Sequence, residues 1–260
     1  MRKQFVGVLA ACMLLASGAA CGGKKNGNTV PQVQPEAELA KGMQLFRHGQ
    51  YRKAQVVFQR LTFEFNVTQE ELAEARYYVA ECNYQLGDYV QAAADFRKVA
   101  DEFSTTEYAA TALLRAGDSN LKLWHRPELD PSYGETALAI YQELAGRYPE
   151  SDAAARARLH VRKLESQFAE KAYKTGIFYM RRKAFDSAII YFKDVIANYP
   201  SAQRAPDALL RLVDAYKAIG YTQELQETCE HLRRFYPNAT GLKASCPAEA
   251  SAAPPPATPT

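Results

Sequence analysis

Apolar and polar positions follow a helical period along most of the chain. The clearest segment contains Ala188 and Phe192, which lie one turn apart and so share a helix face. Pro200 cannot continue a helix and marks its end. Upstream, Gly176 and Tyr179 give a preceding helix a small residue and an aromatic. The pattern therefore predicts two consecutive helices that pack closely.

This frame, Ala-x3-Phe-x7-Pro, recurs in four other places, each with an aromatic just before its closing position. Its members are Ala54, Phe58 and Asn66; Ala92, Phe96 and Ser104; Ala137, Tyr141 and Pro149; and Leu225, Cys229 and Pro237, and the closing aromatics are Phe65, Phe103, Tyr148, Tyr199 and Tyr236. Five matches favour tetratricopeptide repeats, helix pairs of about 34 residues, over a plain helical bundle. The sequence predicts an all-α fold, a tetratricopeptide-repeat superhelix (α-solenoid) of about five helix pairs.

The spacing of the frames and the composition predict the organisation of the chain. Pro149 and Pro200 are separated by a stretch without proline, which predicts one helix of about 45 Å. The expected segments are a signal peptide (1–20), a flexible tether (21–35), repeats 1–3 (36–149), the long helix with repeats 4–5 (150–243), and a disordered Ala/Pro-rich tail (244–260).

Helix starts are indicated by a Ser or Thr followed three residues later by Glu, the capping-box pattern. Three such pairs are Thr68 with Glu71, Ser104 with Glu107, and Ser132 with Glu135. The last pair begins within an enlarged turn, His125 to Gly134, whose two prolines exclude a continuous helix.

The N-terminus has the pattern of an export signal: Arg2 and Lys3, an apolar run, and small residues up to Cys21. The residues before Cys21 resemble a lipoprotein cleavage site, which predicts an acylated, palmitate-bearing Cys21 and a lipid anchor. Cleavage at Cys12 and ordinary secretion are the alternatives. Gly22, rather than Asp, follows Cys21 and favours the outer membrane.

Catalytic and cofactor patterns are not found, so we expect no enzyme activity, no cofactor and no metal site. The net charge of +3, to which Arg2 and Lys3 contribute, offers no concentrated basic patch for nucleic acid. Cys229 and Cys246 could pair in an oxidising compartment, although two free thiols remain the alternative.

A repeat superhelix presents an extended concave face lined by the first helix of each pair. Aromatic side chains flanked by charge on such a face suit a bound peptide. The expected substrate-peptide residues are Met43, Phe46, Arg47, Tyr77, Glu81 and Tyr84. The alternative for Met43 and Phe46 is a place in the core between repeats.

The whole pattern resembles the BamD family of outer-membrane protein assembly lipoproteins. The resemblance rests on Cys21, the short polar tether, the five repeats with closing aromatics, and the proline-bounded loop at Pro127 and Pro131. A second similar stretch runs through Tyr173 and Phe178 to Arg181 and Arg182.

The resemblance implies a lipid-anchored adaptor of the BAM complex on the periplasmic face of the outer membrane. Its partners would be unfolded outer-membrane β-barrel proteins, the POTRA domains of BamA, at which Arg181 and Arg182 would dock, and other BAM lipoproteins. Two alternatives are a tetratricopeptide lipoprotein for type IV pilus secretin assembly and a soluble periplasmic protein that coordinates the envelope.

Overall fold

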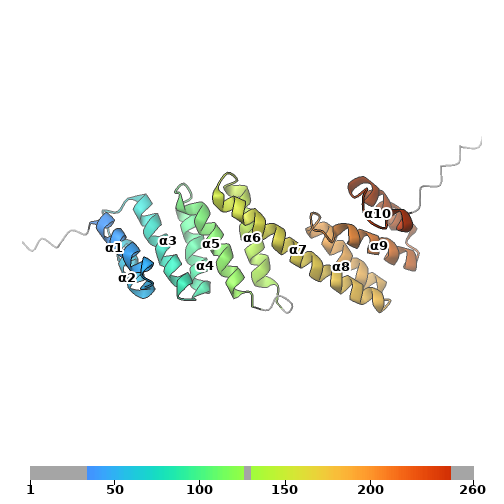
Figure 1. Ribbon diagram of the computed structural model, residues 1–260, viewed down its shortest axis with the longest axis horizontal. Coiled ribbons are helices and arrows are strands. Elements are labelled where there is room, and N and C mark those ends of the chain that lie inside the picture. Colours follow the sequence, from blue (N-terminus) through green and yellow to red (C-terminus); the bar gives the residue numbers. More distant parts are fainter. Residues whose placement is uncertain (1–33, 126–129, 247–260) are drawn as a thin grey trace, which may run out of the picture. The chain divides into compact units, whose positions relative to one another are not determined.

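A computed structural model describes residues 34–125 and 130–246, and these residues form eleven helices and no strand (Figure 1). The signal peptide, Cys21 with its tether, part of the loop after His125 and the tail beyond Cys246 lie outside the described residues. The helices are α1 (Pro35–Arg47), α2 (Tyr51–Leu61), α3 (Gln69–Gln85), α4 (Tyr89–Glu102), α5 (Tyr108–Leu123), α6 (Ser132–Arg147), α7 (Asp152–Arg181), α8 (Phe185–Asn198), α9 (Ala205–Ile219), α10 (Thr222–Phe235) and α11 (Leu242–Ser245).

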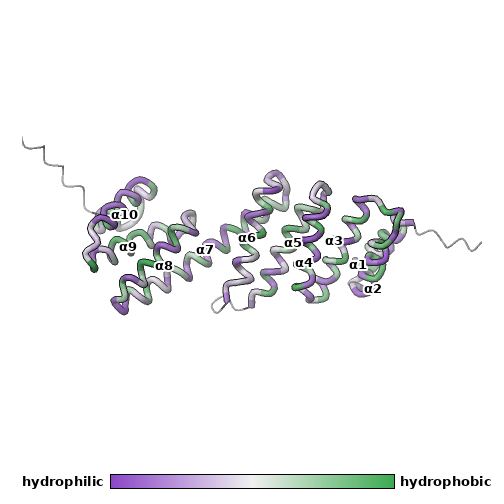
Figure 2. Tube along the Cα trace, turned by 180° about the vertical axis from the view of Figure 1, so that it is seen from behind, coloured by the Kyte–Doolittle hydropathy of each residue, from purple (hydrophilic) through white to green (hydrophobic). Residues whose placement is uncertain are grey.

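Each helix from α1 to α10 packs against the next one in the chain, and first helices of neighbouring pairs also touch. The pairs are α1–α2, α3–α4, α5–α6, α7–α8 and α9–α10. Figure 2 shows hydrophobic and hydrophilic positions alternating along the helices, so one face of each is available for burial. The predicted tetratricopeptide-repeat superhelix is confirmed.

Within the pairs, the two backbones approach closely where the first helix has a small residue. A Cβ added to Gly42 would lie 2.5 Å from the Phe58 ring, and one added to Gly176 would lie 2.5 Å from the Phe192 ring. Gly117 meets the Tyr141 ring in the same way, at 2.5 Å. In these three pairs, the buried aromatic of the second helix thus occupies the space that a side chain on the first helix would need.

The fifth pair exchanges the sizes of the two residues. Val213 takes the place of the glycine, and Cys229 takes the place of the ring, at the same sequence separation as Gly176 and Phe192. Both are buried in the same apolar cluster. Leu225, which stands where the other pairs have a fully buried alanine, is only partly buried. In the last pair, the larger side chain therefore comes from the first helix and the smaller one from the second.

The long helix α7 joins two apolar clusters. Its first part, up to Phe168, belongs to the cluster that includes α3–α6, and its second part, from Ala169, belongs to the cluster of α8–α10. With 30 residues, α7 spans about 45 Å. The predicted long helix between the two groups of repeats is confirmed.

Helix starts agree with the sequence only in part. Thr68 forms the predicted capping box, since its side chain accepts from the Glu71 N–H and Glu71 accepts from the Thr68 N–H. The other two predicted caps are wrong. Ser104 lies ahead of α5, whose N-cap is Glu107, and α6 already includes Ser132.

The closing aromatics behave alike in the later repeats but not in the first. The hydroxyl of Tyr148 donates to the Ser104 carbonyl at 3.0 Å, and that of Tyr236 donates to the Pro200 carbonyl at 2.7 Å, so each reaches the closing position of the preceding repeat. Phe103 is 5% exposed. Phe65 is fully exposed, because α2 ends at Leu61, one turn earlier than α4 does in its frame.

Order extends beyond the expected start of the tail. The composition predicts disorder from residue 244, but α11 continues to Ser245 and Cys246 is buried. A disulfide to Cys229, with an S–S distance of 1.96 Å, connects this segment to α10. The predicted start of the tail at residue 244 is too early, because amino-acid composition does not reveal the ordering effect of one disulfide.

We expect Gly176→Ala to lower the free energy of unfolding by about 1–3 kcal/mol, because the new methyl group would overlap the Phe192 ring. Urea unfolding followed by circular dichroism measures this. Gly146→Ala is the matched control, since it is helical with nothing within 4 Å of an added Cβ. It should stabilise by about 0.5–1 kcal/mol. Equal stability changes for the two variants would contradict the close approach.

Candidate functional site

The residues predicted to bind a peptide fall into an exposed part and a buried part. Arg47 is exposed at the end of α1, and Met43 and Phe46 are half-buried. The Phe46 ring lies 5.2 Å from the ring of Tyr51 and 5.5 Å from that of Tyr78. Phe46 therefore contributes to the contact between the first two repeats as well as to the surface.

The expected exposure of Tyr77 and Glu81 is wrong, since they are 8% and 7% exposed. The Tyr77 hydroxyl donates to Glu81 at 3.0 Å. Glu81 accepts two hydrogen bonds from the Arg115 guanidinium, at 2.5 and 2.8 Å, across the boundary between α3 and α5. A bidentate pair of this kind fixes direction as well as distance. These side chains therefore connect the second repeat to the third.

Arg115 has two further partners. It donates to Asp118 at 3.2 Å, and its guanidinium carbon lies 3.8 Å from the centre of the Tyr84 ring, close enough for a cation–π contact. Asp118 in turn accepts from the Tyr141 hydroxyl at 2.8 Å. Tyr84 and Arg115 are both partly exposed, so the network reaches the surface through them.

Burial and charge explain the titration of the network. Burial alone would lower the pKa of Arg115, but the hydrogen bonds and charge of Glu81, with Asp118, raise it above its ordinary value. Burial raises the pKa of Tyr77, and the neighbouring Glu81 adds to the effect. Arg115 and Tyr77 therefore both keep their protons at neutral pH.

The same arrangement recurs between α7 and α9. Arg204 donates to Glu170 at 2.5 Å and to Asp207 at 2.8 Å, and its guanidinium lies 4.9 Å from the Tyr173 ring. Each arginine follows its glutamate by 34 residues, one repeat length. Sequence reasoning missed both clusters. The signal that could have found them is Glu-x2-Tyr followed one repeat later by Arg-x2-Asp.

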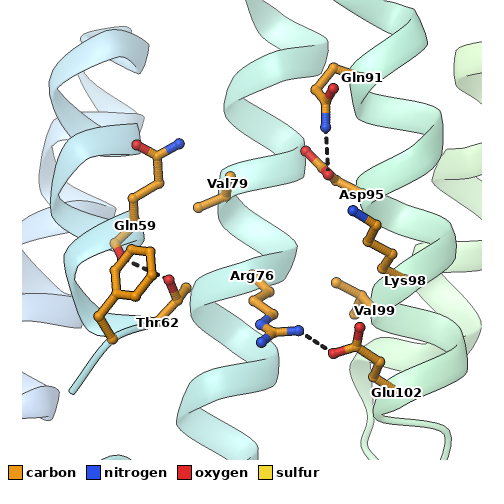
Figure 3. Close-up of a pocket in the computed structure, with 10 residues that line it drawn as sticks. Gln59, Thr62, Arg76, Val79, Gln91, Asp95, Lys98, Val99 and Glu102 are labelled. Atoms are coloured by element: carbon orange, nitrogen blue, oxygen red, sulfur yellow. Dashed lines mark hydrogen bonds and ion pairs between the residues drawn. The ribbon is translucent and has the colours of Figure 1, made fainter.

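A groove of about 680 Å³ lies over α3, between α2 and α4 (Figure 3). Arg76 extends from α3 to an ion pair with Glu102, and Gln91 donates to Asp95 at 2.8 Å. Val79 and Val99 supply apolar lining, and Phe63 borders the groove. Arg76 and Glu102 pair with each other, and Asp95 and Lys98 add one charge of each sign, so the groove presents a mixed polar and apolar surface.

The residues predicted for partner docking lie at the end of α7. Arg181 and Arg182 are both exposed, and the Arg182 guanidinium lies 4.4 Å from the exposed Phe178 ring. Lys183 adopts a left-handed φ of 59°, whereas the corresponding turn positions in three other pairs are glycines. Such a backbone costs a side-chain-bearing residue about 1 kcal/mol. The turn displays three consecutive cations, of which Arg182 lies over the Phe178 ring.

Cys82 is the one free thiol in the described residues, and it is buried in α3. Burial raises its pKa to about 12, so it carries no thiolate at neutral pH. The structure pairs Cys229 with Cys246. No cysteine of the described part therefore offers a nucleophile.

In residues 34–125 and 130–246, no three His, Cys, Asp or Glu side chains are placed to hold a metal ion. His160 stacks on Tyr141 with ring centres 4.7 Å apart, and His231 lies 4.6 Å from Phe235.

None of the helices in this part combines the length and the apolar character that a membrane span requires.

Taken together, the helix pairs and the surfaces between them define a tetratricopeptide-repeat protein whose candidate sites are binding surfaces. The chain belongs to the YfiO family of outer membrane lipoproteins, which matches residues 31–232. That match covers α1 to α9 and most of α10.

Several curated relatives are named outer membrane protein assembly factor BamD. The chain is 26% identical to the one from Caulobacter vibrioides, over 83% of this chain and 71% of that protein. It is 31% identical to the one from Vibrio cholerae, over 40% of this chain and 43% of that protein. The relative from Xylella fastidiosa strain 9a5c is 23% identical, over 94% of this chain and 86% of that protein.

We expect Arg115→Met to lower the free energy of unfolding by about 3 kcal/mol or more, because Glu81 would remain buried without its cation. Arg204→Met is the matched control, because Arg204 pairs with Glu170 in the same way but the two side chains are 40% and 33% exposed, against 18% and 10% for Arg115 and Glu81. It should cost less than about 1 kcal/mol. Urea unfolding distinguishes the two, and a larger loss for Arg204→Met would contradict the assignment.

The thiols can be counted directly in the chain from Cys21 onward with Cys21 replaced by serine. Maleimide should label no cysteine in the native protein, since Cys82 is buried and the other two are paired. We expect one label after unfolding without reductant and three after unfolding with reductant, measured by mass spectrometry. Rapid labelling of the native protein would contradict the burial of Cys82 or the disulfide.

Proposed function

We propose that this chain is a lipid-anchored, non-catalytic adaptor that assists the assembly of β-barrel proteins into the outer membrane. The observation that carries the proposal is the family match over residues 31–232, which includes nearly all of the repeat structure. The names of the curated relatives support the same role. Acylation of Cys21 would hold the chain at the periplasmic face of the membrane.

The N-terminal repeats would receive the C-terminal targeting segment of an unfolded barrel. Arg47 supplies an exposed cation, with Met43 and Phe46 next to it on α1 and Tyr84 on α3 as partly exposed side chains. An aromatic side chain and a terminal carboxylate of the substrate would complement these groups. Tyr77 and Glu81 would support this surface from below, through Arg115, rather than touch the peptide.

The C-terminal repeats would dock on the POTRA domains of the barrel subunit BamA through Arg181 and Arg182. Lys183 adds a third cation, and Phe178 supplies an aromatic centre. An exposed aromatic stacked under a guanidinium is the type of residue pair that dominates protein interfaces. Other BAM lipoproteins would bind elsewhere on the same chain.

The family match favours this role over secretin assembly and over a soluble envelope protein. A depletion strain that carries a copy of this chain tests it. The wild-type copy should restore β-barrel levels in the outer membrane and copurify with BamA. The double variant Arg181→Glu with Arg182→Glu should lose copurification by tenfold or more, because its charge opposes docking (about 1.4 kcal/mol for each tenfold).

Arg162→Glu is the control, since Arg162 is an exposed cation on the same helix. It should behave as wild type. If depletion left barrel levels unchanged, or if a pilus secretin alone were lost, the proposed function would be wrong.

A further inference from the structure

The short loop between α2 and α3 displays two phenylalanines to solvent. Phe63 is 80% exposed and Phe65 is fully exposed. Neither ring has an aromatic or cation–π partner among the described residues, although most phenylalanines of the repeats have one or are buried. Leaving a phenylalanine in water forgoes about 1.5–3 kcal/mol of burial free energy, so two on one loop are a substantial apolar surface.

The loop is held in place, so the exposure is built into the fold. Beyond Leu61, the N–H groups of Phe63 and Glu64 donate to the Arg60 and Leu61 carbonyls at 3.1 and 3.2 Å. The Thr62 hydroxyl donates to the Gln59 carbonyl at 2.8 Å. The capping box at Thr68 fixes the other end. Because α2 ends early, Phe65 points to solvent, whereas the equivalent aromatics of other repeats pack against the protein.

The loop lies at the end of the first helix pair where the chain enters it. Helices α1 and α2 pack against each other and are joined by the tight turn at Gly49 and Gln50. They therefore run in opposite directions, and α1 begins where α2 ends. Cys21 precedes Gln34 by 13 residues, so a lipid on Cys21 would keep this end within about 45 Å of a bilayer.

We propose that Phe63 and Phe65 contact the bilayer surface at headgroup depth and so orient the first repeat toward the membrane. The proposal rests on the lipid anchor of the proposed function. A single lipid anchor fixes only proximity, whereas a second point of contact also fixes direction. Aromatic side chains are favoured at the membrane–water interface. The loop contributes orientation rather than the main affinity, which the acyl chains supply.

The charges around the loop select the lipid. Glu64 lies between the two phenylalanines, and Glu70 and Glu71 open α3 directly after them. These carboxylates are repelled by an anionic surface, and the repulsion weakens as salt is added. The contact is therefore with zwitterionic lipid. The alternative is that a basic surface of a partner protein covers the two rings, and vesicle binding distinguishes the two cases.

The test uses the chain from Cys21 onward, coupled through the Cys21 thiol to a maleimide-headgroup lipid in phosphatidylcholine vesicles with brominated acyl chains. The buried Cys82 and the disulfide leave Cys21 as the reactive thiol. Phe65→Trp places a reporter on the loop. Val90→Trp is the matched control, since Val90 is 61% exposed at the start of α4, at the other end of α3. The emission of Trp124, the only native tryptophan, is measured in the unsubstituted chain and subtracted.

Bromine should quench the added emission roughly twofold at position 65 and leave position 90 unchanged, because only the loop reaches the interface. Adding phosphatidylglycerol at low salt should reduce the quenching at position 65. Equal quenching at the two positions, or none at position 65, would overturn the proposal and leave a protein partner as the occupant. Coupling bypasses natural acylation, so flotation of the cellular protein with membranes tests the anchor separately.

Discussion

The fold depends on the close approach of two helix backbones within each pair. Gly42, Gly117 and Gly176 leave no room for a Cβ, and the facing ring fills the space instead. Interiors of this density tolerate neither an added methyl group nor a lost ring. Because the contact sets the separation of the two helices, it also sets where the outer faces of the pair point. The positions of surfaces far from the glycines therefore depend on these contacts.

Between repeats, ion pairs are added to the apolar contacts. Glu81 with Arg115 and Glu170 with Arg204 each join two first helices across one repeat length. The first pair is largely buried, and the second is partly exposed. This difference predicts a stiffer junction in the N-terminal repeats, where a peptide is proposed to bind, than between α7 and α9. Buried ion pairs of this kind specify geometry more than they add stability.

The sequence alone predicts the number and order of the helix pairs, because the Ala-x3-Phe frame and the absence of proline in α7 are local patterns. It does not predict burial across repeats. Tyr77 and Glu81 are expected on the surface because Arg115, which pairs with Glu81, lies a full repeat away. Likewise, Phe65 matches the closing frame of the other repeats, and only the early end of α2 turns it outward. A loop of seven residues, 62–68, is enough to alter its environment.

The two halves of the chain offer different surfaces, a cation beside aromatics on α1 and a cation-rich turn after α7. The proposed function assigns a different partner to each of these two surfaces. Site-specific photocrosslinking in growing cells tests this most directly, with the crosslinker at Arg47 in one strain and at Arg182 in another. The account predicts adducts with unfolded β-barrel proteins from position 47 and with the barrel subunit from position 182. The same partner at both positions, or no envelope protein at either, would contradict it.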